Sequence, residues 1–86
     1  MAMHGIVYAT NPRRGMIAIQ TDGYGFTIIE DDVSNFELGD EVRWENDTGL
    51  GGEDYYNVTQ DHTYHVFVQN HYVPPHLLRK QLLLEN

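Results

Sequence analysis

Histidine is the residue of this chain with the clearest chemical potential, because a neutral imidazole is a common metal ligand and titrates near neutral pH. Four of the five histidines fall within fifteen residues, and the five are His4, His62, His65, His71 and His76. Their spacing matches neither a helical histidine pair with a catalytic glutamate nor half of a zinc finger, and cysteine is absent. We therefore expect scattered surface histidines and no metal site. A milder expectation is pH dependence, since protonating all five would change the formal net charge from −8 to −3.

Carboxylates are numerous, and paired carboxylates can act as general acid and base when burial raises the pKa of one of them. The adjacent acids lie in predicted loops or at the starts of predicted strands, where charges are normally solvated; they are residues 30–32, 40–41 and 53–54. The loop at 47–53 lacks the alternating oxygen ligands of a calcium site. The one serine, Ser34, has no histidine at a suggestive spacing. We expect no catalytic residue, no cofactor and no enzymatic activity.

The chain is short and acidic. Its 86 residues suit one domain, and thirteen Asp and Glu against five Lys and Arg give a formal net charge of −8. Phosphate neutralisation needs clustered Lys and Arg, so this balance argues against a simple polyanion binder and against an anionic membrane surface. No apolar run approaches the ~20 residues needed to span a bilayer, and the first residues lack a secretory pattern. We expect a cytoplasmic protein.

The first sixty residues are typical of short strands separated by turns. Asp22-Gly23 between two apolar runs indicates a tight hairpin, and Trp44 is expected in or near the core. The expected strands cover residues 5–10, 16–20, 24–30, 38–44 and 55–60. Five short strands with glycine-containing turns predict a small closed five-stranded β-barrel over residues 1–61.

The last third, residues 62–86, is expected to form an extension packed on the same domain. Residues 63–69 alternate in polarity and predict an added strand, which Pro74 and Pro75 stop because proline cannot donate to a sheet. Residues 76–84 predict a short helix, whose apolar stripe consists of Leu77, Leu78 and Leu82. A helix this short is unstable alone in water and must dock on something.

Four segments occur in an order and spacing that resemble the cold-shock-domain family. They are residues 5–7 (Gly-Ile-Val), 11–19 (Asn-Pro-Arg-Arg-Gly-Met-Ile-Ala-Ile), 36–42 (Phe-Glu-Leu-Gly-Asp-Glu-Val) and 57–59 (Asn-Val-Thr). The resemblance covers roughly residues 5–60. It implies a five-stranded oligonucleotide/oligosaccharide-binding (OB) barrel that binds single strands by stacking bases on aromatic side chains of its first three strands.

The chain departs from the family at most of these stacking positions. Ala9 and Thr10 stand where the resemblance implies Trp and Phe, and Met16 and Ala18 replace the two Phe of the second strand. In the third strand Phe26 is kept, whereas Ile28 stands in place of His. The face keeps Arg13 and Arg14 at its basic turn. If nucleic acid binds, the candidate residues are Tyr8, Arg13, Arg14, Met16, Tyr24, Phe26 and Ile28.

Met16, Ala18, Phe26 and Ile28 would leave an apolar patch if nothing covered it, which soluble monomers tend to avoid. We therefore expect the C-terminal extension to cover this patch, within one chain or across a dimer. Two functions stay open: a non-enzymatic module that binds a protein or self-associates through this face and the extension, and a divergent, weak binder of single-stranded nucleic acid. A barrel that binds a small ligand or a metal through the histidine-rich extension is a third possibility.

Overall fold

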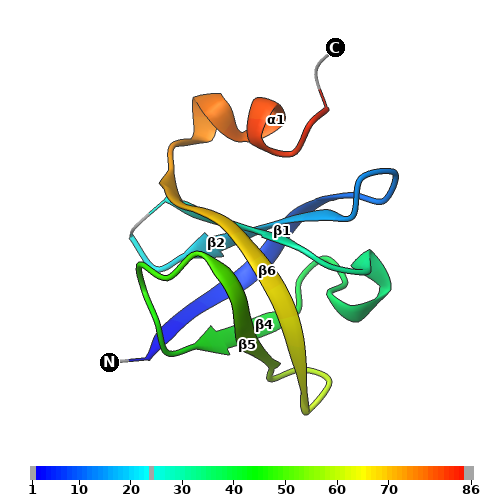
Figure 1. Cartoon of the computed structure of the whole chain (residues 1–86), viewed down its shortest axis with the longest axis vertical. Coiled ribbons are helices and arrows are strands. Elements are labelled where there is room, and N and C mark those ends of the chain that lie inside the picture. The colour runs from blue at the N-terminus through cyan, green and yellow to red at the C-terminus, as the bar shows by residue number, and fades with distance from the viewer. Residues whose placement is uncertain (1, 24, 85–86) are drawn as a thin grey trace.

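The computed structural model describes residues 2–23 and 25–84 as six antiparallel strands that close into a barrel, followed by a short helical segment (Figure 1). The neighbour order is β1-β2-β3-β6-β5-β4, and β4 pairs back onto β1. The strands are β1 (Met3–Asn11), β2 (Met16–Thr21), β3 (Phe26–Glu30), β4 (Glu41–Trp44), β5 (Gly51–Asn57) and β6 (His62–Val73). The predicted all-β barrel is confirmed.

The last strand differs from the prediction in its place. The sequence predicts it as an addition to five strands, but β6 lies between β3 and β5 and closes the barrel. With twelve residues it is long enough to pair with both neighbours, and all seven residues of β5 are in register with it. Alternating polarity predicts a strand without naming its neighbours, so the pattern could not show that the barrel has six strands.

The C-terminal helix is shorter than expected. A 3₁₀ turn, η2 (Pro75–Leu77), leads into α1 (Leu78–Gln81), and Leu83 adopts a left-handed φ of 61° that ends the helix. None of the described helical segments is long and apolar enough to cross a membrane.

Side chains alternate between the two faces of each strand, and those that point inward fill the interior of the barrel. Ile17 and Ile19 of β2 point inward, and Trp44 of β4 stacks on Tyr55 of β5 with ring centroids 4.8 Å apart. Trp44 is therefore in the core, as expected. Burial raises the pKa of Tyr55, and the negative charge of Glu53 adds to this shift.

The connection between β3 and β4 is held by a buried carboxylate. The amide Nδ2 of Asn57 and the amide Nε2 of Gln60 each donate to Oδ2 of Asp40 at 2.8 Å. The prediction that residues 40–41 form a solvated acidic pair was wrong for Asp40, which is buried because it joins this connection to the end of β5. The same connection contains the 3₁₀ turn η1 (Val33–Asn35), whose first turn is capped by Asp32.

Candidate functional site

The outward side of β2 and β3 carries the apolar patch expected from the sequence. We call it the platform and define it as Met16, Ala18, Phe26 and Ile28. Ala18 lies directly opposite Ile28 in the β2–β3 register. Because side chains alternate along a strand, Ile17 and Ile19 enter the barrel interior while Met16 and Ala18 point outward.

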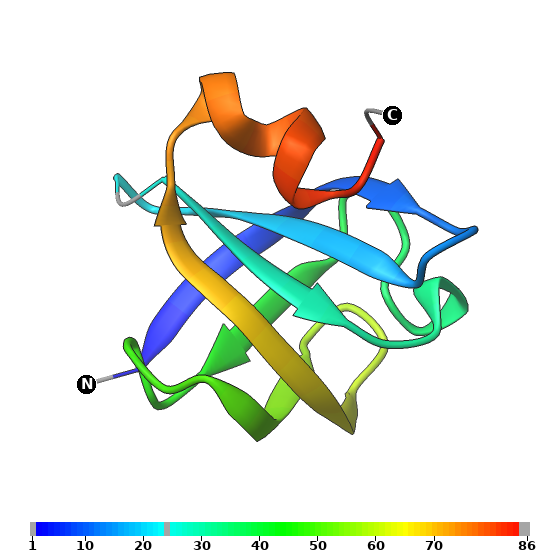
Figure 2. The same cartoon turned by 45° about the horizontal axis from the view of Figure 1, so that its top comes forward.

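The platform is covered by the C-terminal segment of the same chain, which crosses over the β1–β2–β3 side of the barrel (Figure 2). Leu78 and Leu82 pack on it together with Val73, and Leu82 is 1% exposed. The covered positions are themselves buried: Ile28 is 0% exposed and Phe26 is 5% exposed. The expectation that the extension covers this face is confirmed, and the cover forms within one chain.

The other nucleic-acid candidates lie at the margin of the platform. The Tyr8 ring is 55% exposed and contacts Phe26, with centroids 5.0 Å apart. Arg13 and Arg14 are exposed in the β1–β2 turn. Tyr24 lies outside the described residues. The structure thus places Tyr8 beside the platform, but buries Met16, Phe26 and Ile28 under leucines.

Asn11, at the end of β1, anchors the cover. Its amide Nδ2 donates to the carbonyl oxygen of Leu82 at 2.8 Å and to that of Leu83 at 3.4 Å, while its Oδ1 accepts from the backbone N–H of Arg13 at 3.2 Å. The residue is 5% exposed. Carbonyl groups at the end of a helix lack hydrogen-bond donors within the helix, and the Asn11 amide supplies such a donor to the Leu82 carbonyl at the end of α1. Asn-Pro in the sequence predicts a turn there, but nothing in that pattern marks the side chain as an anchor.

The helix end is closed by backbone hydrogen bonds of the Schellman type. The N–H of Leu84 donates to the carbonyl of Arg79 at 2.9 Å, and the N–H of Leu83 donates to that of Lys80 at 3.1 Å. This fold-back presents Leu82 to the platform. It leaves Leu83 and Leu84 half-exposed at the rim.

The cations are unevenly distributed. Four of the five occur in two segments, the β1–β2 turn and α1, and these are Arg13, Arg14, Arg79 and Lys80. The Asn11 bonds hold the two segments together, so the covered end of the molecule is the basic one. The acids are concentrated in residues 22–61.

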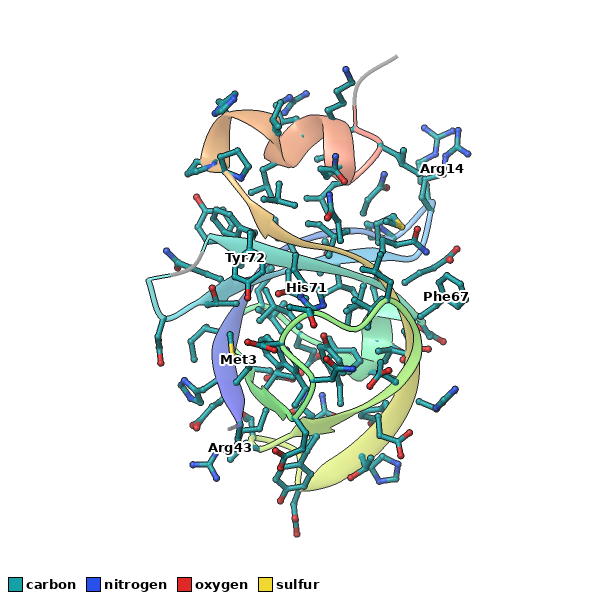
Figure 3. All side chains as sticks on the ribbon, turned by 60° about the vertical axis from the view of Figure 1, so that its left-hand side comes forward. Met3, Arg14, Arg43, Phe67, His71 and Tyr72 are labelled. Atoms are coloured by element: carbon teal, nitrogen blue, oxygen red, sulfur yellow. The ribbon has the colours of Figure 1, made fainter. Side chains whose placement is uncertain are left out.

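His4 lies on β1 and His76 in η2, whereas the other three histidines lie on β6. No group of three or more His, Cys, Asp or Glu that could hold a metal occurs within residues 2–23 and 25–84. His71 lies under the loop before β5 (Figure 3), where its Nε2 donates to the Gly49 carbonyl at 2.8 Å and its Nδ1 is 3.1 Å from Oγ1 of Thr27. The imidazole of His65 is 2.9 Å from Asp54 on the outer surface.

His4 forms a different kind of contact, because both of its ring nitrogens face carboxylates. Nδ1 is 3.1 Å from Oδ2 of Asp22, and Nε2 is 2.7 Å from Oε2 of Glu41. Burial alone would lower the pKa of His4, but the hydrogen bonds to Glu41 and Asp22 outweigh it and raise this pKa above 6.5. The contact ties β1 to β4 and to the β2–β3 turn, beside a cleft of about 370 Å³.

Asp32, in the acidic segment 30–32, caps the 3₁₀ turn η1. The backbone N–H of Ser34 and its hydroxyl donate to Oδ1 of Asp32 at 3.0 and 2.8 Å, and these bonds lower the pKa of that carboxyl. Ser34 therefore acts as part of a helix cap.

No family model, curated protein or solved structure matches this chain.

Replacement of the anchor, Asn11→Ala, should lower the free energy of unfolding by about 1–3 kcal/mol, because it leaves a buried carbonyl without its donor. Urea titration followed by Trp44 fluorescence measures this. Asn70→Ala is the matched control, since its exposed side chain bonds only to the neighbouring backbone, and it should change stability by less than about 0.5 kcal/mol. Equal effects of the two changes would contradict the anchoring role.

The His4 contact should make stability depend on pH. Because the folded-state pKa is raised, its contribution is fully present below about pH 6.5, the unfolded value, and is lost as pH rises through the folded pKa. The stability difference between wild type and His4→Gln should therefore shrink between about pH 6 and pH 8 in urea titrations. His76→Gln serves as the control for removal of a histidine. A difference that grows with pH would contradict the assignment.

Proposed function

We propose that this chain is a non-enzymatic protein-interaction module that binds a protein surface, in another protein or in a second copy of itself. The observation that carries the proposal is the burial of the platform by Leu78 and Leu82. Because the chain's own helix packs on the apolar side chains of the platform, this face stabilises the fold and is closed to other molecules. Contacts with other molecules then fall to the exposed apolar side chains around it, among them Tyr8, Leu77 and Leu83.

Three considerations weigh against base stacking as the main activity. Each stacked base contributes about 1–3 kcal/mol, and most of the implied stacking positions are occupied by residues without aromatic rings. The one aromatic kept from the resemblance, Phe26, is buried. The formal net charge of −8 disfavours approach of a phosphate backbone to most of the surface.

The likeness to cold-shock domains is part of the proposal. The four ordered segments support a divergent relative of that family, and the closed antiparallel barrel is consistent with an OB-like fold. In this proposal β6 and α1 are the elements that separate the chain from a five-stranded barrel. They turn the former stacking face into an internal contact.

A divergent single-strand binder is the second candidate. It is favoured by the gathering of Arg13, Arg14, Arg79 and Lys80 at one end of the molecule, next to the exposed ring of Tyr8. Four cations can neutralise few phosphates, so such binding would be weak and sensitive to salt.

A labelled twelve-nucleotide single strand separates the two candidates. Fluorescence anisotropy is measured with protein up to about 100 μM, in about 50 mM and about 200 mM salt, and should show no binding. This range is sufficient because even non-specific binders have dissociation constants of about 10⁻⁴–10⁻⁶ M. Arg14→Ala should be silent. Saturable binding at low salt that Arg14→Ala weakens, and that falls steeply with added salt, would contradict the proposal and establish the second candidate.

A further inference from the structure

The tip of the β2–β3 turn carries Asp22 followed by Gly23, and no other aspartate or asparagine of the chain precedes a glycine. The turn is closed by Thr21, whose N–H and Oγ1 donate to the Gly25 carbonyl at 3.0 and 2.8 Å. Asp22 and Gly23 lie beyond this closure, and both are exposed. Their side chain and backbone are therefore open to reaction with each other and with water.

An aspartate in its acid form can react with the peptide nitrogen of the next residue, because the short chain between the two groups brings them together. The nitrogen attacks Cγ and forms an N–Cγ bond, and the carboxyl OH leaves with the N–H proton as water. The product is a cyclic succinimide. Water then opens the ring at either carbonyl, and one of the two openings gives isoaspartate, in which the backbone continues through the former side chain. One water leaves and one is taken up, so the mass is unchanged and no co-reactant is needed.

The backbone nitrogen of Gly23 is well placed to be the attacking atom. No described residue accepts a hydrogen bond from its N–H. In contrast, the N–H of Thr48, which follows Asp47, donates to Oδ1 of Asn46 at 3.2 Å. Gly23 has no Cβ to hinder the approach, and its φ of 80° uses the conformational freedom of glycine. Apart from its chain neighbours, no described atom lies within 4 Å of the place that a Cβ would take.

The carboxyl group of Asp22 is accessible as well. Its side chain is 78% exposed, and Oδ2 is 3.1 Å from Nδ1 of His4. No described residue donates a hydrogen bond to Oδ1. The Cγ carbon is therefore held on one side only, by His4, and is open to the Gly23 nitrogen.

We propose that Asp22 is a site of spontaneous isomerisation, at which aspartate is converted to isoaspartate through a succinimide formed with the Gly23 nitrogen. The conversion lengthens the backbone of the turn by one methylene group and shortens the arm of the carboxylate by one. The carboxylate then loses its contact with Nδ1 of His4, while Nε2 keeps its contact with Glu41. The modification thus breaks the part of the His4 contact that ties β1 to the β2–β3 turn.

Incubation of the folded protein at neutral pH for several weeks tests the proposal, when samples are digested with an endoproteinase that cuts before aspartate but not before isoaspartate. Cleavage before residue 22 should be lost with time while the mass of the chain stays constant. Electron-transfer fragmentation should locate the isoaspartate at residue 22. Asp47 and Asp61 are internal controls, because they are exposed but are followed by residues with side chains, and cleavage before them should be retained.

Asp22→Glu is the matched control variant, because it keeps a carboxylate on the turn but would have to close a larger ring. Reversed-phase chromatography should resolve a second form of equal mass from aged wild type and none from aged Asp22→Glu. NMR titration of this second form then reports on His4. Burial lowers the pKa of His4, but the contacts with Glu41 and Asp22 raise it above 6.5, so loss of the Asp22 contact should lower this pKa relative to fresh protein.

Cleavage before residue 22 that persists unchanged in aged protein would overturn the proposal. So would isoaspartate that accumulates at Asp47 or Asp61 as fast as at Asp22, because the Gly23 nitrogen would then confer no added reactivity. A second form in which His4 titrates as in fresh protein would overturn the loss of the His4 contact.

Discussion

The packing of two leucines on the platform is the contact on which the rest of this structure depends. Leu78 and Leu82 bury Met16, Ala18, Phe26 and Ile28, and form with them a second apolar core outside the barrel. Full burial of a leucine contributes about 1.5–3 kcal/mol, a large share of what a chain of 86 residues can gain. A helix of one turn cannot exist without such a partner. Barrel face and helix therefore stabilise each other, and Asn11 fixes their register through the Leu82 carbonyl.

This contact also determines which surfaces remain for binding. It removes the face where bases would stack and places Arg79 and Lys80 beside the β1–β2 turn. Most acids are left on the loops and on the opposite strands. Among the apolar side chains that stay exposed, Tyr8, Leu77 and Leu83 lie at the rim of the cover, and Phe67 lies on β6. The C-terminal segment thus covers the platform with α1 and leaves Phe67 of β6 exposed.

Much of the fold could be predicted because the strands and turns have local causes. The apolar run of residues 16–20 and the Asp22-Gly23 turn predict the β2–β3 hairpin, and the leucines near the C-terminus predict a cover. What could not be predicted depends on long-range pairing. Nothing local in residues 63–69 shows that they close the barrel, and nothing local marks Asn11 as an anchor or Asp40 as a buried acceptor. The exposure of Phe67 follows from the same long-range pairing, which turns Val66 and Val68 inward.

The C-terminal segment seals the platform within a single chain. Methyl NOE spectra of a sample at about 50 μM, and again after tenfold dilution, test it most directly, because a cover formed between chains would weaken with dilution. We expect strong contacts from the Leu78 and Leu82 methyl groups to the Phe26 ring and the Ile28 methyl groups, unchanged in intensity per molecule on dilution. Random-coil shifts for residues 75–84, or contacts that fade with dilution, would contradict it.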